Sequence, residues 1–332
     1  MKFLRAAWVV LGLASIAVAS DPAMRSRTIG QFQLDKAPRQ GGLAHGNVPP
    51  GTTRLVIDGK EAGFAADGLF IVGFGRDHAA TTLITAYRAD GTNVTEILPV
   101  LPTAWRIENL RSLPRRRLPD AEFEAIRSLE LAQIETARKA ATGANGWRQR
   151  FIWPVPGRIT GQFGAQRIYA GEPGAPHNGV DLAGAVGTPV LAPADGVVIL
   201  AATAPFTLEG NLLMLDHGLG LNSAFLHLSR IDVKLGEQVR QGQQIGAIGM
   251  TGRATGPHLH WGMKWQDERI DPAMLAPRRQ GDSIGRAPAP SPLLAIAGLP
   301  ARHRPQVRQA RAQAFREGGR RRPSDPFRVR SH

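Results

Sequence analysis

The segment "GPHLHWG", residues 256–262, places two histidines one residue apart, between glycine and proline on one side and tryptophan on the other. In a β-strand, residues i and i+2 point to the same face, so His258 and His260 would present both imidazoles to one pocket. Two neutral imidazoles on one face suit a metal ion or an acid–base site. A polar surface strand that carries two histidines would show the same pattern, so this segment alone leaves both interpretations open.

A second segment, "HNGVD" at residues 177–181, combines a histidine with an acid. Pro176 and Gly179 disfavour a helix here, and in extended backbone an even spacing puts His177 and Asp181 on the same side. Two histidines and one carboxylate, with a fourth position left for water, form a catalytic zinc arrangement. The set His177, Asp181 and His260 therefore predicts a site for Zn²⁺.

Two further histidines are candidates for catalysis rather than for metal binding. His258 would lie beside the metal, and His227 in "AFLHLS" could approach from across the sheet. Two histidines near a metal-activated water can position it, accept its proton and stabilise a developing oxyanion. His217 in "LDHGLG" precedes turn glycines and is expected in a turn or at the surface.

The region around these motifs, residues 147–277, has the texture of a β-protein. Short runs such as "TPVLAPADGVVILA" and "GNLLMLDHGLGL" follow one another closely and are separated by glycines. This pattern predicts an antiparallel sheet, a sandwich or a barrel.

Residues 147–277 resemble the catalytic domain of lysostaphin-type (LytM-like) zinc metallopeptidases, which cleave peptide cross-bridges in bacterial peptidoglycan. The resemblance runs through "GQFG", "HNGVDLAG", "TPVLAPADGVV", "FLHLS" and "GQQIGAIGMTGRATGPHLHWG". It implies an antiparallel β-sheet peptidase of the duplicated-hybrid-motif type that acts on peptidoglycan. It also implies that His177, Asp181 and His260 bind zinc while His227 and His258 are catalytic.

A different function is open to members of this family. Some LytM-like proteins have lost metal ligands and activate cell-wall amidases as non-catalytic scaffolds. All five expected residues are present in this chain, which favours an enzyme. The motifs would be similar for a pentaglycine bridge, a D-Ala–diaminopimelate link or a bond within the stem, so they do not identify the bond that is cleaved.

The region before the peptidase is expected to contain a small domain and a linker. Residues 20–105, after a loose lead-in, hold β-branched runs broken by Asp-Gly at 58–59, 67–68 and 90–91, which predicts a β-sandwich and resembles a β-domain of some exported relatives. Residues 106–146 are a predicted linker, with a helix within 119–143 that begins at the capping residue Asp120. Its mostly apolar stripe is Phe123, Ile126, Glu130, Ile134 and Ala137.

The two ends of the chain carry different signals. Residues 1–19 combine Lys2 and Arg5 with a short apolar run that ends in Ala-Val-Ala, which predicts a cleaved signal peptide and a periplasmic or secreted protein. No second stretch is apolar enough to predict a transmembrane helix, and there is no cysteine to form a disulfide.

The basic character of the sequence belongs to its last part. Of the net charge of +14, residues 278–332 contribute 13 arginines against three acids, or +10. This Pro- and Arg-rich tail is predicted to be disordered and to contact anionic envelope polymers or a membrane surface. Export and the lack of interleaved aromatic residues argue against a nucleic-acid partner.

Overall fold

The computed structural model describes residues 27–29, 31–110 and 121–279. The predicted signal peptide, the capping residue Asp120 and all but the first two residues of the predicted tail lie outside these ranges. Among the described residues, none of the helices combines the length and the apolar character needed to cross a membrane.

The first part of the chain forms two four-stranded sheets that share one core, as the turn pattern predicted. Gly59, Gly68 and Gly91 follow the three aspartates and adopt φ near +80°, a conformation that glycine reaches without steric cost. The first sheet has the order β1-β2-β3-β6 and the second β5-β4-β7-β8. The strands are β1 (Arg27–Ile29), β2 (Phe32–Leu34), β3 (Leu43–Asn47), β4 (Thr52–Ile57), β5 (Lys60–Ala62), β6 (Leu69–Gly73), β7 (Thr81–Arg88) and β8 (Asn93–Pro99).

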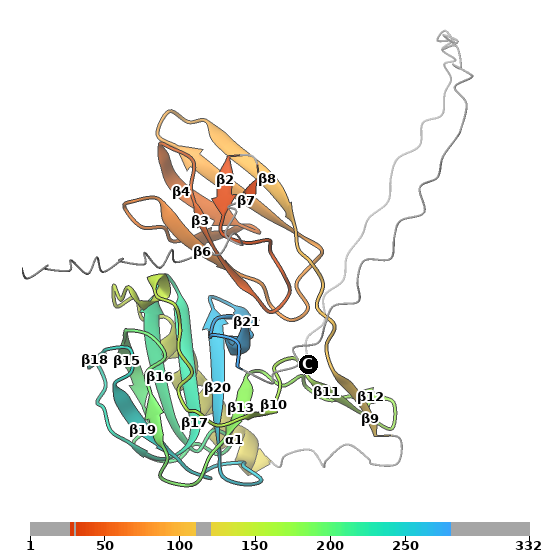
Figure 1. The fold of residues 1–332 in the computed structure, drawn as a ribbon, viewed down its shortest axis with the longest axis vertical. Coiled ribbons are helices and arrows are strands. Elements are labelled where there is room, and N and C mark those ends of the chain that lie inside the picture. The colour runs from red at the N-terminus through yellow and green to blue at the C-terminus, as the bar shows by residue number, and fades with distance from the viewer. Residues whose placement is uncertain (1–26, 30, 111–120, 280–332) are drawn as a thin grey trace, which may run out of the picture. The chain divides into compact units, whose positions relative to one another are not determined.

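The second part of the chain forms a ten-stranded antiparallel sheet, with β20, β17, β16 and β15 side by side (Figure 1). Its main path is β10-β13-β20-β17-β16-β15-β18; β19 pairs with β14 and β17, and β21 pairs with β20. The described strands do not close into a barrel. Of the alternatives that the sequence left open, the antiparallel sheet is the one observed. The strands are β10 (Ile159–Gly161), β13 (Val180–Ala183), β14 (Pro189–Leu191), β15 (Gly196–Ala201), β16 (Asn211–Gly218), β17 (Leu221–Ile231), β18 (Gln238–Val239), β19 (Gln244–Ile248), β20 (His258–Trp265) and β21 (Glu268–Ile270).

The two faces of this sheet are covered differently. On β17, Leu221 and Phe225 point into the main core, whereas Ala224 and Leu226 belong to a second, smaller cluster. That second cluster includes Ala137 of α1 (Ala121–Arg138), so α1 packs on the face that carries Leu226. Because Leu226 lies directly opposite His260 in the register of β17 and β20, α1 and His260 share one face of the sheet.

The buried stripe of α1 differs from the predicted one. Ile126 is 44% exposed, so the prediction that it belongs to the packed face is wrong. Arg127 replaces it: the guanidinium donates two hydrogen bonds to the carboxylate of Glu209, at 2.6 and 2.7 Å, and a third to Glu130. Glu130 is buried because it also accepts hydrogen bonds from the backbone and hydroxyl of Thr207. A charged network thus ties the helix to the segment that precedes β16.

Replacing Arg127 with methionine should lower the free energy of unfolding by about 3 kcal/mol, because two largely buried carboxylates would lose their cation. Chemical denaturation measures this change. Arg230→Met is the matched control: Arg230 pairs with Asp232 at 2.8 Å in a position where half of its side chain is exposed, so its loss should cost less than about 1 kcal/mol. Equal, small effects of the two substitutions would contradict the role given to the network.

The linker contains an element that the sequence did not predict. The strand β9 (Ile107–Leu110) pairs in parallel with β11 (Gln166–Tyr169), which forms a hairpin with β12 (Glu172–Pro173). Trp105, just before β9, packs edge-on against Phe163 with ring centroids 5.5 Å apart. The chain before the helix is therefore part of the structure that surrounds residues 163–177.

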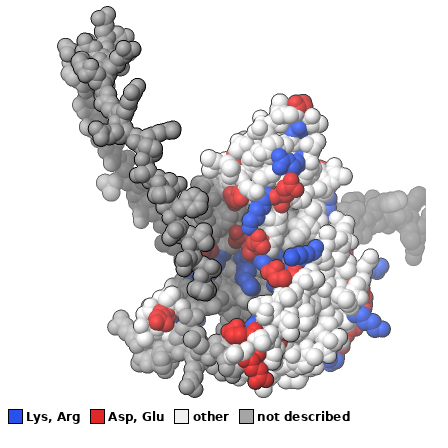
Figure 2. Space-filling view, turned by 180° about the vertical axis from the view of Figure 1, so that it is seen from behind, with Lys and Arg blue, Asp and Glu red and all other residues white. Residues whose placement is uncertain are grey.

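Charges on the described surface are mixed. Figure 2 shows blue and red side chains interspersed on one face, with no large field of one sign on it. This agrees with a nearly neutral body, and with a net charge that resides in the last part of the sequence.

Candidate metal centre

The two histidines of "HLH" open strand β20, so their i, i+2 spacing places them on one face, as expected. The neighbouring strand β13 runs antiparallel to β20, and Asp181 lies directly opposite His260. Side chains of directly opposed residues stand on the same face of a sheet. The strand register therefore brings the carboxylate of Asp181 next to the imidazole of His260.

His177 reaches the same place from the loop before β13. The backbone of His177 exchanges two hydrogen bonds of 2.8 Å with the 164–165 segment, which fixes the loop. The Nδ1 atom of His177 lies 3.0 Å from the carbonyl of Gln162. Because a carbonyl only accepts, Nδ1 carries the proton and Nε2 keeps its lone pair for a metal ion.

Three donor atoms converge at the centre. Oδ1 of Asp181 lies 2.9 Å from Nδ1 of His260 and 3.1 Å from Nε2 of His177, and the two nitrogens are 3.2 Å apart. Ligand atoms at the ordinary Zn–N and Zn–O distances of about 2.0–2.2 Å in a tetrahedral site lie about 3.3 Å from one another. Two imidazoles and a carboxylate are also donors that zinc prefers. The described residues thus fit the metal.

The electrostatics favour the metal-binding protonation state for Asp181 and His260, whereas zinc has to compete with a proton at His177. Although burial acts to raise it, hydrogen bonds from His177 and His260 hold the pKa of the Asp181 carboxyl well below its usual range. Burial lowers the pKa of His260, which keeps this imidazole neutral. Burial also opposes a charge on His177, but the hydrogen bond to Asp181 outweighs it and raises the pKa of that imidazole. An anionic carboxylate and a neutral His260 are ready to bind a cation.

The two predicted catalytic histidines lie beside the three donors. Nε2 of His258 is 3.7 Å from Oδ1 of Asp181, and the ring of His227 lies 4.9 Å from that of His258. Nδ1 of His258 is 2.8 Å from the carbonyl of Gly256, and Nδ1 of His227 is 2.9 Å from that of Thr251. Each Nδ1 is therefore protonated, which leaves each Nε2 as an acceptor. The structure brings all five predicted residues together.

His227 reaches the centre through an irregularity of β17. Simple alternation from Phe225 would point residue 227 into the main core, on the opposite face from the metal donors. The pairing of β16 with β17 shifts by one residue between Phe225 and Leu228, and His227 has φ +65°. Such a bulge redirects a side chain. The side chain is also buried, and this burial lowers the pKa of His227 to about 4.

His217 is buried, so the prediction of a surface position is wrong. It is the second-last residue of strand β16 and has no exposed surface, and its nitrogens lie 2.8 Å from the carbonyl of Asp195 and from the hydroxyl of Ser223. Burial lowers the pKa of His217 to about 4. Gly218 ends the strand and Gly220 lies in the turn that follows, so the turn begins after His217 and does not bring it to the surface.

Gly179 of "HNGVD" lies so close to the candidate ligand His260 that no side chain fits there. A Cβ atom at this position would lie 2.5 Å from the carbonyl of Trp261 and 2.6 Å from Nε2 of His260. Gly179→Ala should weaken zinc binding by roughly 10–100-fold, because the His260 ring must move. Competition with a chromophoric chelator measures the affinity. A Cβ at Gly256 would meet open space, so Gly256→Ala is the control, and equal affinities for the two variants would contradict this explanation.

Comparison with known proteins agrees with this geometry. The family described as "Peptidase family M23" matches residues 175–272. A solved structure of a putative peptidase M23 from Pseudomonas aeruginosa is 31% identical, and the similarity covers 72% of this chain and 95% of that one, with a TM-score of 0.55. The chain belongs to peptidase family M23.

Peptidases of family M23 are zinc metallopeptidases, so the expected cofactor, Zn²⁺, is confirmed. The peptidoglycan DD-endopeptidase ShyA of Vibrio cholerae is 43% identical over 114 residues, which are 34% of this chain and 26% of that protein. The cell division protein DipM of Caulobacter vibrioides is 33% identical over 156 residues, 45% of this chain and 24% of that protein. The chain thus spans about a quarter of the length of these curated relatives.

Proposed function

We propose that this M23 peptidase is an exported zinc endopeptidase that hydrolyses peptide bonds in the stem peptides or cross-links of peptidoglycan. The observation that carries the proposal is the centre itself, where three donor atoms lie within 3.2 Å of one another and two imidazoles stand beside them. The similarity to a protein named as a peptidoglycan DD-endopeptidase supports the substrate class.

In this proposal His177, Asp181 and His260 hold the zinc ion. When bound, zinc polarises the scissile carbonyl as a Lewis acid and lowers the pKa of water. His258 and His227 supply the proton transfers, because each has its Nδ1 proton engaged by a backbone carbonyl and its Nε2 free to accept.

The reaction adds one water across the peptide bond. An Nε2 acceptor takes a proton from the attacking water as the new carbon–oxygen bond forms. The resulting imidazolium then gives that proton to the leaving amine as the carbon–nitrogen bond breaks, or donates a hydrogen bond to the developing oxyanion. The low pKa of His227, about 4, keeps this side chain unprotonated before the reaction begins.

The remaining sequence expectations complete the proposal. Residues 1–19 would be the signal peptide, 20–105 the β-domain, 106–146 the linker, 147–277 the peptidase and 278–332 the basic tail, in a periplasmic or secreted protein. The tail would attract the chain to anionic envelope polymers, since its sequence has a net charge of +10.

The experiment is to incubate the purified protein with isolated sacculi and to identify the released muropeptides by mass spectrometry. New peptide termini that disappear with a chelator and return with zinc are the expected result. If the protein releases nothing but increases hydrolysis by an added cell-wall amidase, and His260→Ala does so equally, the non-catalytic scaffold is the correct function.

A further inference from the structure

Three basic residues lie near the end of β20 that is opposite "HLH", on the face of the sheet that also carries His260 and α1. Lys264 is on the same face as His258 and His260, because all three positions are even-numbered steps along one strand. Arg269 of β21 lies directly opposite Lys264. Arg138 is the last residue of α1, which packs on this face. We call Arg138, Lys264 and Arg269 the basic cluster.

The charges of the basic cluster lower the pKa values of their neighbours within it. Burial, followed by the charge of Arg269, lowers the pKa of Arg138 to about 10. Burial, followed by the charge of Arg138, also lowers the pKa of Lys264. Like charges repel, so a structure that holds three of them together favours an anion between them.

Arg138 is the member of the cluster that most needs a partner. Its Nη1 atom is buried and has no hydrogen-bond partner among the described residues. Leaving a charged donor buried and unpaired costs free energy, which a bound anion would recover. The unpaired Nη1 of Arg138, close enough to two other cations to be affected by their charge, therefore favours the binding of an anion over a purely packing role.

The nearby acids already have other partners or lie in solvent. Glu209 receives both hydrogen bonds from Arg127, and Asp267 lies 2.6 Å from Lys60 but 3.9 Å from Lys264. Glu135, one turn before Arg138, is exposed. Glu209 and Asp267 attract the cluster, but among the described residues the one ion pair that reaches it is the 3.9 Å contact between Lys264 and Asp267.

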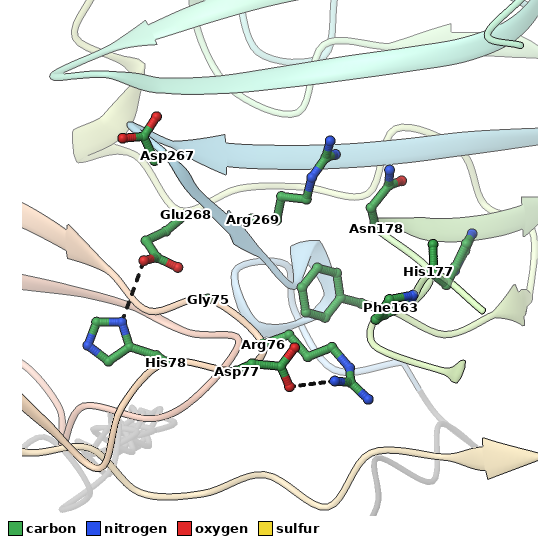
Figure 3. Close-up of a pocket in the computed structure, with 12 residues that line it drawn as sticks. Gly75, Arg76, Asp77, His78, Phe163, His177, Asn178, Asp267, Glu268 and Arg269 are labelled. Atoms are coloured by element: carbon green, nitrogen blue, oxygen red, sulfur yellow. Dashed lines mark hydrogen bonds and ion pairs between the residues drawn. The ribbon is translucent and has the colours of Figure 1, made fainter. Parts of the chain in front are cut away.

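A pocket extends from Arg269, one member of the basic cluster, to the metal-binding candidate His177. Its volume is about 500 Å³, and its wall includes Arg269, Asn178 and the metal-binding candidate His177. Figure 3 shows Arg269 beside the ribbon of β20, with Asn178 and then His177 next along the wall. A ligand in this pocket could contact Arg269 while its other end lies beside His177.

The spacing along the strand fixes the size of such a ligand. Lys264 is four residues after His260, and a strand rises about 3.3 Å per residue, so the two positions are about 13 Å apart. An extended peptide covers the same distance with about four residues. Arginine and lysine recognise carboxylates, and guanidinium groups do so with paired hydrogen bonds.

We propose that the basic cluster of Arg138, Lys264 and Arg269 is a subsite that binds a free carboxylate of the substrate, about four residues from the cleaved bond. The inference rests on the proposed peptidase function, and it deepens that function by naming a determinant of substrate choice. Peptide stems that end in a carboxylate at this distance are then preferred over neutral peptides of the same length.

The test compares two soluble peptides that are identical except that the terminal carboxylate four residues from the scissile bond is free or amidated. The wild-type enzyme should cleave the acid with a kcat/KM about tenfold higher, mostly through KM, as expected for a charge-assisted contact. Arg269→Gln and Lys264→Gln should bring the two peptides to within about twofold of each other, through a higher KM for the acid. Lys234→Gln, at an exposed position elsewhere, should keep the tenfold preference.

Charge reversal provides a second comparison that does not depend on loss of activity. The double substitution Arg269→Glu/Lys264→Glu, which changes the charge of the cluster from +3 to −1, should cleave an aminoethylamide peptide, which is cationic at the same position, better than the acid. Equal kcat/KM for acid and amide in the wild-type enzyme would overturn the subsite while leaving the peptidase intact. Cleavage of neither peptide, under conditions where sacculi are also untouched, would overturn the proposed function and the subsite with it.

Discussion

His260→Ala is expected to lose both the zinc ion and all measurable hydrolysis. Nδ1 of His260 is one of the three donor atoms. The residue is 6% exposed, so a water molecule cannot easily take the place of the lost nitrogen as a ligand. The loss of affinity should exceed the roughly 10–100-fold that follows removal of an outer hydrogen-bond partner. Zinc content after dialysis, measured by mass spectrometry, and peptide release from sacculi test the two parts separately.

Asp181→Asn serves as the comparison for this substitution. It keeps the shape of the side chain and removes the charge that both His177 and His260 face. It should also release zinc, because a neutral amide is a much weaker ligand than a carboxylate. A His260→Ala protein that keeps a full complement of zinc would show that the metal is bound elsewhere.

His258→Ala and His227→Ala are expected to keep the zinc ion and to lose turnover. Neither ring belongs to the three donor atoms, and each Nδ1 is engaged by a backbone carbonyl on the side away from the centre. Removing a general acid or base lowers the rate by about 10²–10⁴-fold. The prediction is therefore a kcat reduced by that factor, with zinc content near one ion per chain.

The double substitution sharpens this prediction. If His258 and His227 act on one proton-transfer sequence, the second replacement should cost little beyond the first, because groups that work as a unit are not additive. Equal loss of zinc in His258→Ala and His260→Ala would contradict the division of roles within "HLH". Melting temperatures close to that of the wild-type protein are the required control for the three variants expected to keep zinc, His258→Ala, His227→Ala and the double substitution.

The sequence predicted the centre because its chemistry is concentrated in two short motifs. The same-face argument for His258 and His260 holds, since both lie on the regular strand β20. It holds less well for "HNGVD": Asp181 is in β13, but His177 lies before the strand and is placed by its backbone pairing with residues 164–165. Local spacing could not reveal that second contact.

Other parts of the site depend on contacts that are distant in the sequence. Alternation along β17 would have sent His227 to the wrong face, and only the bulge against β16 redirects it. The pairing of Arg127 with Glu209 spans 82 residues, so helical periodicity placed Ile126 in the packed stripe and gave no sign that Arg127 would take its place. The strand β9 forms only because β11 offers it a free edge. Helical and strand periodicity carry no signal for such pairings.

Anomalous X-ray diffraction at the zinc absorption edge, from crystals of the full chain, tests the central claim most directly. The account predicts one strong peak within about 2.0–2.2 Å of Nε2 of His177, a carboxylate oxygen of Asp181 and Nδ1 of His260. No nitrogen of His227 or His258 should lie at bonding distance from it. A zinc peak coordinated by His227 or His258, or crystals grown with zinc that show no peak among the three donors, would contradict the assignment of this centre.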